Sequence, residues 1–436
     1  MKIKFDQSVN GSSYKYITDN TNDIGKDTLF LKTAQNSKYF DNTHPYITPL
    51  ELLKLWGLDG MKVVGVTGTN GKTTVTAAIY SLMLDLGYKV ALQGTRGVFA
   101  NEERVVNKSM TTPAILETLH NMKLSSDKGC EYFVMEVSSH AIDQNRIESL
   151  PFALKVHTNV TSDHLDYHKT VEEYRRVKSA FFADTTPKLL NKDDIKHITY
   201  NLTNAQSYGI DEPATLKVQA FSLKDGIIAG LKYLSNEEAT FSSPMVGLFN
   251  LSNLLAAIGS VKMLTQKPLQ EICDQVEHFG GVAGRMEVVS QNPLVIVDFA
   301  HTDDGMYQVL DSIKDRDIVV VFGAGGNRDK AKRPKMGVVA GRFAKKVYVT
   351  SDNPRDEVPE QILEDILVGL RGKENVVATP DRRLAIKMAL EDLQDNEVLL
   401  ILGKGDETTQ EIKGVMHPFD DREVVRELLG SNKSSL

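Results

Sequence analysis

The chain has 436 residues, and at roughly 150 residues per domain this length predicts about three domains. Hydrophobic residues make up 41% and charged residues 25%, proportions of a globular protein that exclude a disordered, collagen-like or coiled-coil chain. The 58 acidic and 51 basic residues give a net charge of −7, which excludes the broad basic surface that binds nucleic acids or anionic membranes.

Cysteine usage and the N-terminus indicate the compartment. Cys130 and Cys273 lie far apart and outside any CxxC pattern, which excludes a disulfide scaffold and indicates a reducing environment. The first residues lack the apolar core of a signal peptide. No apolar run approaches the roughly 18 residues of a membrane span. We therefore expect a cytoplasmic protein that neither inserts into membranes nor binds nucleic acid.

The N-terminal residues 1–60 are polar and rich in Asn, Ser and Thr. They contain one strand-like piece at 28–31 and one helical piece at 49–56, which together predict a small, partly irregular module. From residue 61, buried strands alternate with amphipathic helices, a pattern typical of a parallel sheet covered on both faces. The expected elements are strands at 62–68, 88–94, 132–137 and 154–160, a helix at 72–86, a strand-rich stretch at 196–248 and a helix at 250–264.

A second series of strands and helices begins near residue 293 and predicts a doubly wound domain of about 150 residues. Its expected strands are 294–300, 317–324, 346–352, 375–379 and 397–405. Its expected helices are 359–370 and 382–393. The fold class is therefore α/β in three domains. They are a short N-terminal module at 1–60, a central P-loop ATPase-like parallel-sheet domain at 61–284 and a C-terminal Rossmann-like domain at 285–436.

A phosphate-binding turn is predicted where the strand at 63–67 enters GTNGKTT at 68–74 and opens a helix. Glycines permit a tight turn, and the helix N-terminus supplies N–H groups and a positive dipole end. Lys72 can reach β- and γ-phosphates, and Thr73 can ligate Mg²⁺. Val66 stands where the strict Walker pattern has glycine, so we interpret the turn as a P-loop variant.

A second glycine cluster at 323–328 also follows a strand. A dinucleotide-binding fingerprint needs Gly or Ala at its last position, where this chain has Arg328, which disfavours a dehydrogenase. A loop that places Arg328 at the carboxyl end of a strand, where ligands of open sheets bind, fits better.

Candidate metal ligands follow two further strands. Glu136 ends one strand and is a reasonable Mg²⁺ ligand beside a P-loop. His164 and His168 have the spacing of a zinc helix, but Leu165 stands where HExxH has glutamate, which disfavours a metalloprotease. A nucleotide-linked Mg²⁺ suits the cluster better, although hydrogen bonding that shapes the loop explains each residue equally well. The oxygen donors of this cluster are Asn159, Asp163 and Asp166.

Lys178 lies in EEYRRVKSAFF, with Tyr174, Phe181 and Phe182 at near-helical spacing. The pattern allows a solvated lysine on a helix surface or a side chain drawn toward the interior. Composition and spacing alone leave both possibilities open.

Taken together, these segments resemble the Mur ligase family over nearly the whole chain, and within it the members that add diaminopimelate. Each segment alone is a weak match, but their order and spacing along the chain resemble the family. The segments are GTNGKTT at 68–74, MEVSSHAIDQNR at 135–146, TNVTSDHLDYH at 158–168, YRRVKSAFF at 174–182, GLFNLSNLLAAI at 247–258, GRME at 284–287, VDFAHTDD at 297–304 and DNPR at 352–355.

The resemblance implies separate domains for the UDP moiety, for ATP and for the incoming amino acid. It implies that ATP phosphorylates the D-glutamate carboxylate of UDP-MurNAc-L-Ala-D-Glu, and that the amine of meso-diaminopimelate then attacks the acyl phosphate. The products are ADP, phosphate and an amide for cytoplasmic peptidoglycan synthesis. Mg²⁺ and a CO₂-derived carbamate on Lys178 are the implied cofactors, and we expect a monomer.

The resemblance also implies the site residues. Catalytic roles fall on Lys72, His164 and Lys178. ATP contacts fall on Gly68, Thr69, Asn70, Gly71, Lys72, Thr73, Thr74, Asn250, Asn253, Arg285 and Asp298. Metal contacts fall on Thr73, Glu136, His164 and carbamylated Lys178. The UDP-MurNAc-dipeptide pocket falls on Thr111, Thr112, Ser138, Gln144 and Arg146, and the diaminopimelate pocket on Arg328, Asp352, Asn353, Arg355, Gly403 and Glu407.

The DNPR segment resembles the diaminopimelate form of this motif, because lysine-adding relatives lack the arginine. Arg355 can pair bidentately with the distal carboxylate, while Asp352 and Asn353 can hold the distal ammonium. Lysine would leave Arg355 desolvated and unpaired. Two alternatives remain: a ligase like folylpolyglutamate synthase, which would not carry DNPR, and a nucleotide-binding relative without ligase activity.

Overall fold

The computed structural model describes residues 1–436 except 108, 162, 164, 225, 235 and 433–436. Contacts divide the chain into two units, which we describe separately. The first unit comprises Met1–Phe221, Ala229–Phe241 and Ser252–Phe279. The second unit comprises Ser222–Ile228, Ser242–Leu251 and Gly280–Leu436.

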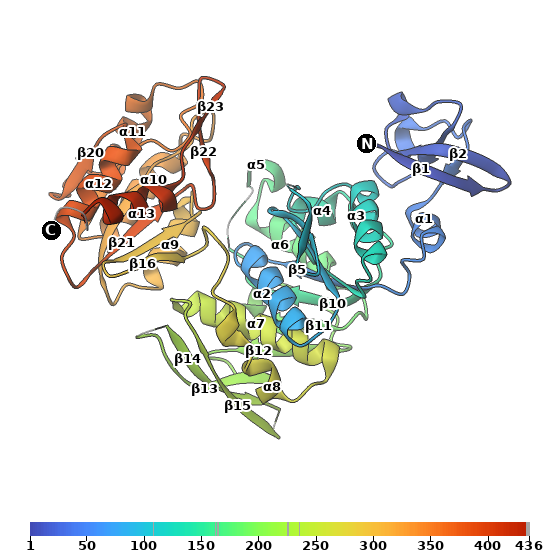
Figure 1. Cartoon of the computed structure of the whole chain (residues 1–436), viewed down its shortest axis with the longest axis horizontal. Helices are drawn as coiled ribbons and strands as arrows, with labels where there is room; N and C mark the ends of the chain where they lie inside the picture. The colour runs from blue at the N-terminus through green and yellow to red at the C-terminus, as the bar shows by residue number, and fades with distance from the viewer. Residues whose placement is uncertain (108, 162, 164, 225, 235, 433–436) are drawn as a thin grey trace. The chain divides into compact units, whose positions relative to one another are not determined.

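The N-terminal module contains more regular secondary structure than the one strand and one helix expected for it. Its sheet has the order β1-β2-β3-β4, and helix α1 follows it (Figure 1). The polar composition hid two signals: Ile3 and Phe5 alternate with lysines and are buried, and Asn10-Gly11 forms the turn between β1 and β2 with φ of 51° and 80°. The elements are β1 Lys2–Val9, β2 Ser12–Thr18, β3 Thr28–Leu31, β4 Tyr46–Ile47 and α1 Pro49–Leu55.

The central sheet has the strand order β15-β14-β13-β12-β11-β10-β5-β9-β6-β7-β8. Its strands are β5 Lys62–Thr67, β6 Val90–Gly94, β7 Gly97–Ala100, β8 Glu103–Val106, β9 Tyr132–Glu136, β10 Phe152–His157, β11 Lys188–Asn191, β12 Ala205–Gly209, β13 Leu216–Ser222, β14 Ile227–Tyr233 and β15 Glu237–Ser243. Its helices are α2 Lys72–Asp85, α3 Ile115–Asp127, α4 Ser139–Asp143, α5 Leu165–His168, α6 Val171–Ala180, α7 Leu248–Thr265 and α8 Leu269–Cys273.

Strand β5 lies between two parallel neighbours, and this register positions the site. Val66 pairs with Glu136 of β9, and Thr67 pairs with His157 of β10. Because the three strands run in the same direction, their carboxyl ends meet at one edge of the sheet. The segments that follow these ends carry most of the site residues expected in the first unit.

The C-terminal sheet has the order β16-β17-β21-β18-β19-β20. Alternate residues face opposite sides: Val320 and Leu400 pack with α9, α10 and α11, whereas Val321 and Ile401 pack with α12 and α13. The elements are β16 Glu287–Gln291, β17 Leu294–Asp298, β18 Asp317–Phe322, β19 Lys346–Val349, β20 Val376–Ala378, β21 Glu397–Leu402, α9 Asp303–Asp311, α10 Lys332–Phe343, α11 Pro359–Leu367, α12 Arg382–Asp392 and α13 Asp421–Asn432. A separate hairpin consists of β22 Thr409–Ile412 and β23 Val415–Pro418.

Helix α7 is long and apolar enough to cross a membrane. The sequence did not predict this, because it contains no continuous apolar run of that length. Asn250, Asn253 and Lys262 interrupt its apolar residues. Because 67% of its most apolar window is buried inside the protein, we describe α7 as a core helix. The expected α/β class is confirmed, with an N-terminal sheet, a central sheet and a largely parallel C-terminal sheet. The central sheet is mixed rather than parallel throughout, because β7 pairs antiparallel with both β6 and β8.

Candidate active site

The turn between β5 and α2 has room only for glycine at two positions. A Cβ at Gly68 would overlap the Thr158 hydroxyl, and a Cβ at Gly71, which adopts φ +85°, would overlap Asn253 Oδ1. Asn159 braces the same turn: its Oδ1 accepts from the backbone N–H of Asn70 at 2.9 Å. The turn is therefore held from β5, from the segment after β10 and from α7.

Lys72 folds back over this turn. Its Nζ donates to the carbonyl oxygens of Gly68 and Thr69, each at 2.8 Å. The ammonium therefore lies over the loop that the helix N-terminus follows, where backbone N–H groups and a positive dipole end favour an anion. Thr74 is buried at the start of the same helix.

Glu136 lies inside the site, with 2% of its surface exposed. Its Oε2 accepts from the Thr73 hydroxyl at 3.0 Å, and its Oε1 accepts from the Thr95 N–H at 3.0 Å. Hard oxygen donors of this kind suit Mg²⁺. Among the residues that the structure describes, no group of three His, Cys, Asp or Glu could hold a metal by itself, so Mg²⁺ here would need phosphate and water oxygens as well.

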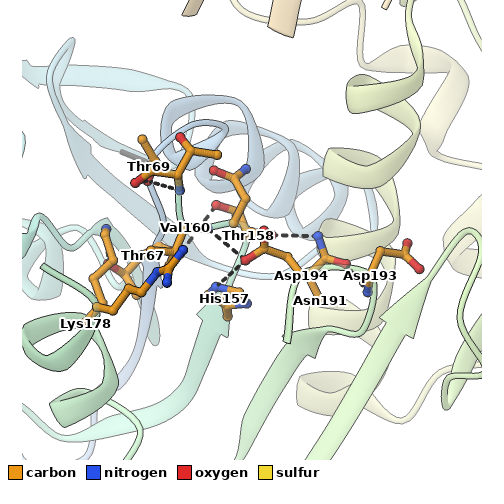
Figure 2. Close-up of polar contacts among 12 residues, drawn as sticks. Thr67, Thr69, His157, Thr158, Val160, Lys178, Asn191, Asp193 and Asp194 are labelled. Carbon is orange, nitrogen blue, oxygen red and sulfur yellow. Dashed lines mark hydrogen bonds and ion pairs between the residues drawn. The ribbon is translucent and has the colours of Figure 1, made fainter. Parts of the chain in front are cut away.

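Lys178 is drawn toward the interior, with 1% exposure (Figure 2). Its Nζ lies 3.5 Å from the Thr67 hydroxyl and 4.8 Å from the centre of the Tyr174 ring. Burial, and secondly the positive charge of Lys72, lower the pKa of Lys178 well below its usual value. The structure thus places a buried amine, with its pKa lowered, beside the end of β5.

His164 lies outside the described residues. Its neighbour Asp163 is described, and its negative charge acts on Lys178 in the direction that raises the lysine pKa.

Near Lys178 the structure adds His157 and Asp194, which the sequence did not single out (Figure 2). His157 is fully buried, and its Nε2 lies 3.6 Å from Asp194 Oδ1. Burial lowers the pKa of His157 to about 3 and raises the pKa of Asp194 to about 6. Asp194 Oδ1 also accepts from the Val160 N–H at 2.9 Å, which shapes the segment after β10.

The residues expected to contact the muramoyl dipeptide form one hydrogen-bonded network beside Glu136. The Thr112 hydroxyl donates to the Glu136 carbonyl at 3.0 Å and accepts from the Ser138 N–H at 2.9 Å. Arg146 donates to the Thr112 carbonyl at 3.0 Å and, through Nε, to Gln144 Oε1 at 2.9 Å. A separate contact, 3.3 Å between hydroxyl oxygens, joins Thr111 to Thr95.

In the second unit, Asp298 ends β17 and is almost completely buried. Its two carboxylate oxygens accept from the N–H groups of Met286 and Ala300, at 2.8 and 2.7 Å. Burial raises its pKa. The Arg285 guanidinium lies over the Phe299 ring at 4.4 Å, and Asn250 donates to the Val246 carbonyl at 2.9 Å.

The loop after β19 carries a cluster of hydrogen-bonded polar side chains in the second unit. Asn353 donates to Glu407 at 2.8 Å, and the fully buried Lys404 donates to the same carboxylate at 2.9 Å. Gly403 adopts φ +113°, and a side chain there would strike the Asp352 carboxylate. The structure therefore brings together four of the expected pocket residues and adds Lys404.

Arg355 completes this loop with an unusual backbone. Its φ is +50°, its Nη1 donates to the Gly326 carbonyl at 2.7 Å, and its Nε donates to Glu411 Oε2 at 3.0 Å. The prediction that lysine would leave Arg355 unpaired did not take account of Glu411, which pairs with the guanidinium in this structure. Arg328 is exposed on the neighbouring loop, with its Cγ close to Gly325.

Comparison with known proteins gives consistent results. Residues 66–261 match the Mur ligase middle domain and residues 284–405 match the Mur ligase glutamate ligase domain. A UDP-N-acetylmuramoyl-L-alanyl-D-glutamate–2,6-diaminopimelate ligase of Wolinella succinogenes is 52% identical over 422 residues, covering 95% of this chain and 96% of the relative. The protein of the same name from Helicobacter hepaticus is 51% identical, covering 92% and 90%.

Solved structures extend this comparison. A solved ligase of that same name matches with a TM-score of 0.70 and 27% identity, covering 99% of this chain and 98% of the other. Folylpolyglutamate synthase of Mycobacterium tuberculosis matches with a TM-score of 0.64 but 16% identity, covering 81% and 91%, which is a likeness of fold alone.

Proposed function

We infer that this chain, which belongs to the Mur ligase family, adds meso-2,6-diaminopimelate to UDP-N-acetylmuramoyl-L-alanyl-D-glutamate with consumption of ATP, as a step of peptidoglycan synthesis. The observation that carries this conclusion is about 50% identity, over nearly the full length of both chains, to ligases of this name. The likeness to folylpolyglutamate synthase is one of fold and gives no support to a folate substrate.

The first half of the reaction would use the turn after β5. A carboxylate is a poor acyl donor, and transfer of the γ-phosphoryl group of ATP gives the D-glutamate carboxylate a leaving group. Lys72 would exchange its bonds to the Gly68 and Thr69 carbonyls for bonds to phosphate oxygens, while the α2 N-terminus holds the remaining phosphate charge. Arg146, beside Gln144, would hold carboxylates of the dipeptide.

A bound Mg²⁺ and a carbamate on Lys178 would lie near the transferred phosphate. Thr73 and Glu136 would hold Mg²⁺, which neutralises phosphate charge when bound. The neutral Lys178 amine would attack CO₂, forming an N–C bond and releasing a proton to solvent, and the resulting carbamate supplies anionic oxygens from a buried position. His164 is proposed as a further ligand on the family resemblance.

The second half of the reaction would use the pocket after β19. There the amine of diaminopimelate would attack the acyl phosphate, forming the amide, expelling phosphate and releasing a proton to solvent. Asp352, Asn353, Glu407 and Gly403 would surround the amino acid, and Arg355 would bind its distal carboxylate. Arg328 would complete this pocket.

The remaining assignments follow from the family. Asn253 would contact the nucleotide beside Gly71, and Asn250, Arg285 and Asp298 would contact its base and ribose. We propose that the chain acts in the cytoplasm as a monomer, with residues 1–60 binding the UDP moiety, 61–284 ATP and 285–436 the amino acid.

The proposal is tested by phosphate release from ATP with purified protein, the UDP-linked dipeptide and one amino acid at a time. Release together with a tripeptide product should require diaminopimelate. Release that requires lysine, or folate with glutamate, would contradict the proposal. ATP binding without an amide product in any mixture would instead indicate a nucleotide-binding protein that does not ligate.

A further inference from the structure

The hairpin β22–β23 holds the loop that carries Arg355. Glu411 N–H donates to Asn353 Oδ1 at 2.9 Å, and Gln410 donates to the Asp352 carbonyl at 2.6 Å. The backbone of Arg355 donates to the Glu411 carbonyl at 3.1 Å and accepts from the Lys413 N–H at 2.8 Å. Since β23 is exposed along its length and β22 only half-buried, the hairpin contributes little to the core. Its contacts instead concentrate on residues 352–355.

The side chains of Glu411 and Arg355 form an ion pair that is open on one side. Their exposures are 28% and 23%, and Oε2 lies 3.0 Å from Nε. Among the described residues, no protein group bonds to Arg355 Nη2 or to Glu411 Oε1. Arg355 also keeps φ +50°, a conformation that is strained for a bulky residue and that collects at functional sites. A surface ion pair has no need of such a backbone.

The pair matches the chemistry of one end of the amino acid. The distal carbon of meso-diaminopimelate carries both an ammonium and a carboxylate, so this end is a zwitterion. Arg355 offers donors for the carboxylate, and Glu411, beside it, offers an acceptor for the ammonium. Asn353 Oδ1 is already occupied by two donors, Lys404 and the Glu411 N–H, and so is a poorer ammonium acceptor.

We propose that Glu411 and Arg355 together bind the zwitterionic distal end of diaminopimelate, with Glu411 accepting hydrogen bonds from the distal ammonium. This assignment rests on the proposed function and adds a specificity residue to it. Lysine, which has only the ammonium, and 2-aminopimelate, which has only the carboxylate, each satisfy half of the pair. Selectivity then comes from matching both charges rather than from leaving Arg355 unpaired.

The test compares kcat and KM for meso-diaminopimelate and for 2-aminopimelate at saturating ATP and dipeptide. In the unmodified chain, KM for 2-aminopimelate should exceed that for diaminopimelate by about 10- to 100-fold, the range of a charge-assisted hydrogen bond. Glu411→Gln should raise KM for diaminopimelate by about that factor and leave KM for 2-aminopimelate within about threefold. Equal KM values in the unmodified chain would overturn the assignment without any variant.

Controls separate the possible failures. Glu423→Gln removes a Glu–Arg pair on the surface of the same unit, to Arg426 at 2.6 Å, and should leave both KM values unchanged. Equal losses with both amino acids in Glu411→Gln would mean that Glu411 only holds Arg355, and no loss would mean that it does neither; both overturn the proposal. An unmodified chain inactive with diaminopimelate would instead overturn the proposed function.

Discussion

The Nζ atom of Lys178 lies 3.5 Å from the hydroxyl of Thr67, the last residue of β5. One residue further along the chain, the phosphate-binding turn begins. A lysine buried at this point lies at the edge of a charged site but is almost completely shielded from solvent. This relationship separates Lys178 from an ordinary helix lysine, and it leads to the first prediction.

Lys178→Ala should abolish ligation, and added bicarbonate should not restore it, because no amine remains to form a carbamate. Phosphate release is the measurement. Arg176→Ala on the same helix removes an exposed cation paired with Glu173 and should retain activity. A fully active Lys178→Ala protein would remove the carbamate from the mechanism.

Glu136→Gln should raise the Mg²⁺ concentration needed for half-maximal activity by about 10- to 100-fold. The amide keeps the shape but loses the charge that faces Thr73. Titration of activity with Mg²⁺ measures the effect. The matched control is Glu131→Gln, an exposed residue just before the same strand, and an identical Mg²⁺ dependence in the two variants would contradict a metal role for Glu136.

Arg355→Lys should raise KM for diaminopimelate by about 10- to 100-fold and leave KM for ATP within about twofold, because a point charge cannot reproduce the planar fork. The substitution keeps the same demand for positive φ, so backbone strain does not differ. Arg383→Lys, in a surface pair with Glu427, is the control. Equal changes in both KM values would count against the pocket assignment.

His157→Phe should make the fold less sensitive to acid. Burial holds the pKa of His157 at about 3, below its usual 6.5, so between these values the unfolded chain binds a proton that the folded chain does not. Acidification below about pH 6.5 therefore destabilises the unmodified protein. Asp194 contributes with the opposite sign, since its pKa is raised to about 6, but it is present in both proteins.

The measurement is the free energy of unfolding in urea at pH 7 and at pH 4.5. The difference between the two proteins should move in favour of His157→Phe at the lower pH. Packing against Phe182 will change the absolute stability at both pH values, so only the change in the difference is informative. Parallel pH profiles would show that His157 is not held neutral by the fold.

Local signals predicted much of the fold. Helix α2 begins at Lys72 as expected and ends at Asp85, because the strand, the glycine turn and the apolar period are all encoded within a few residues. The N-terminal hairpin was also encoded locally, by alternation around Ile3 and by Asn10-Gly11, but the polar composition of the module concealed it.

The side-chain contacts between distant segments of the site could not be predicted in the same way. Thr67 and Lys178 are 111 residues apart, and Arg355 and Glu411 are 56 apart. Only the tertiary fold brings such residues together. The tertiary fold also determines which side chains are buried. The helical spacing around Lys178 fits either an exposed or a buried side chain, and packing against other segments makes it buried.

The pairing of Val66 with Glu136 and of Thr67 with His157 also fixes the number of residues in these strands. Adding or deleting one residue within β5 would exchange its inward and outward side chains and shift the phosphate-binding turn by one position along its neighbours. Insertions within β5 should therefore not be tolerated, whatever residues are inserted.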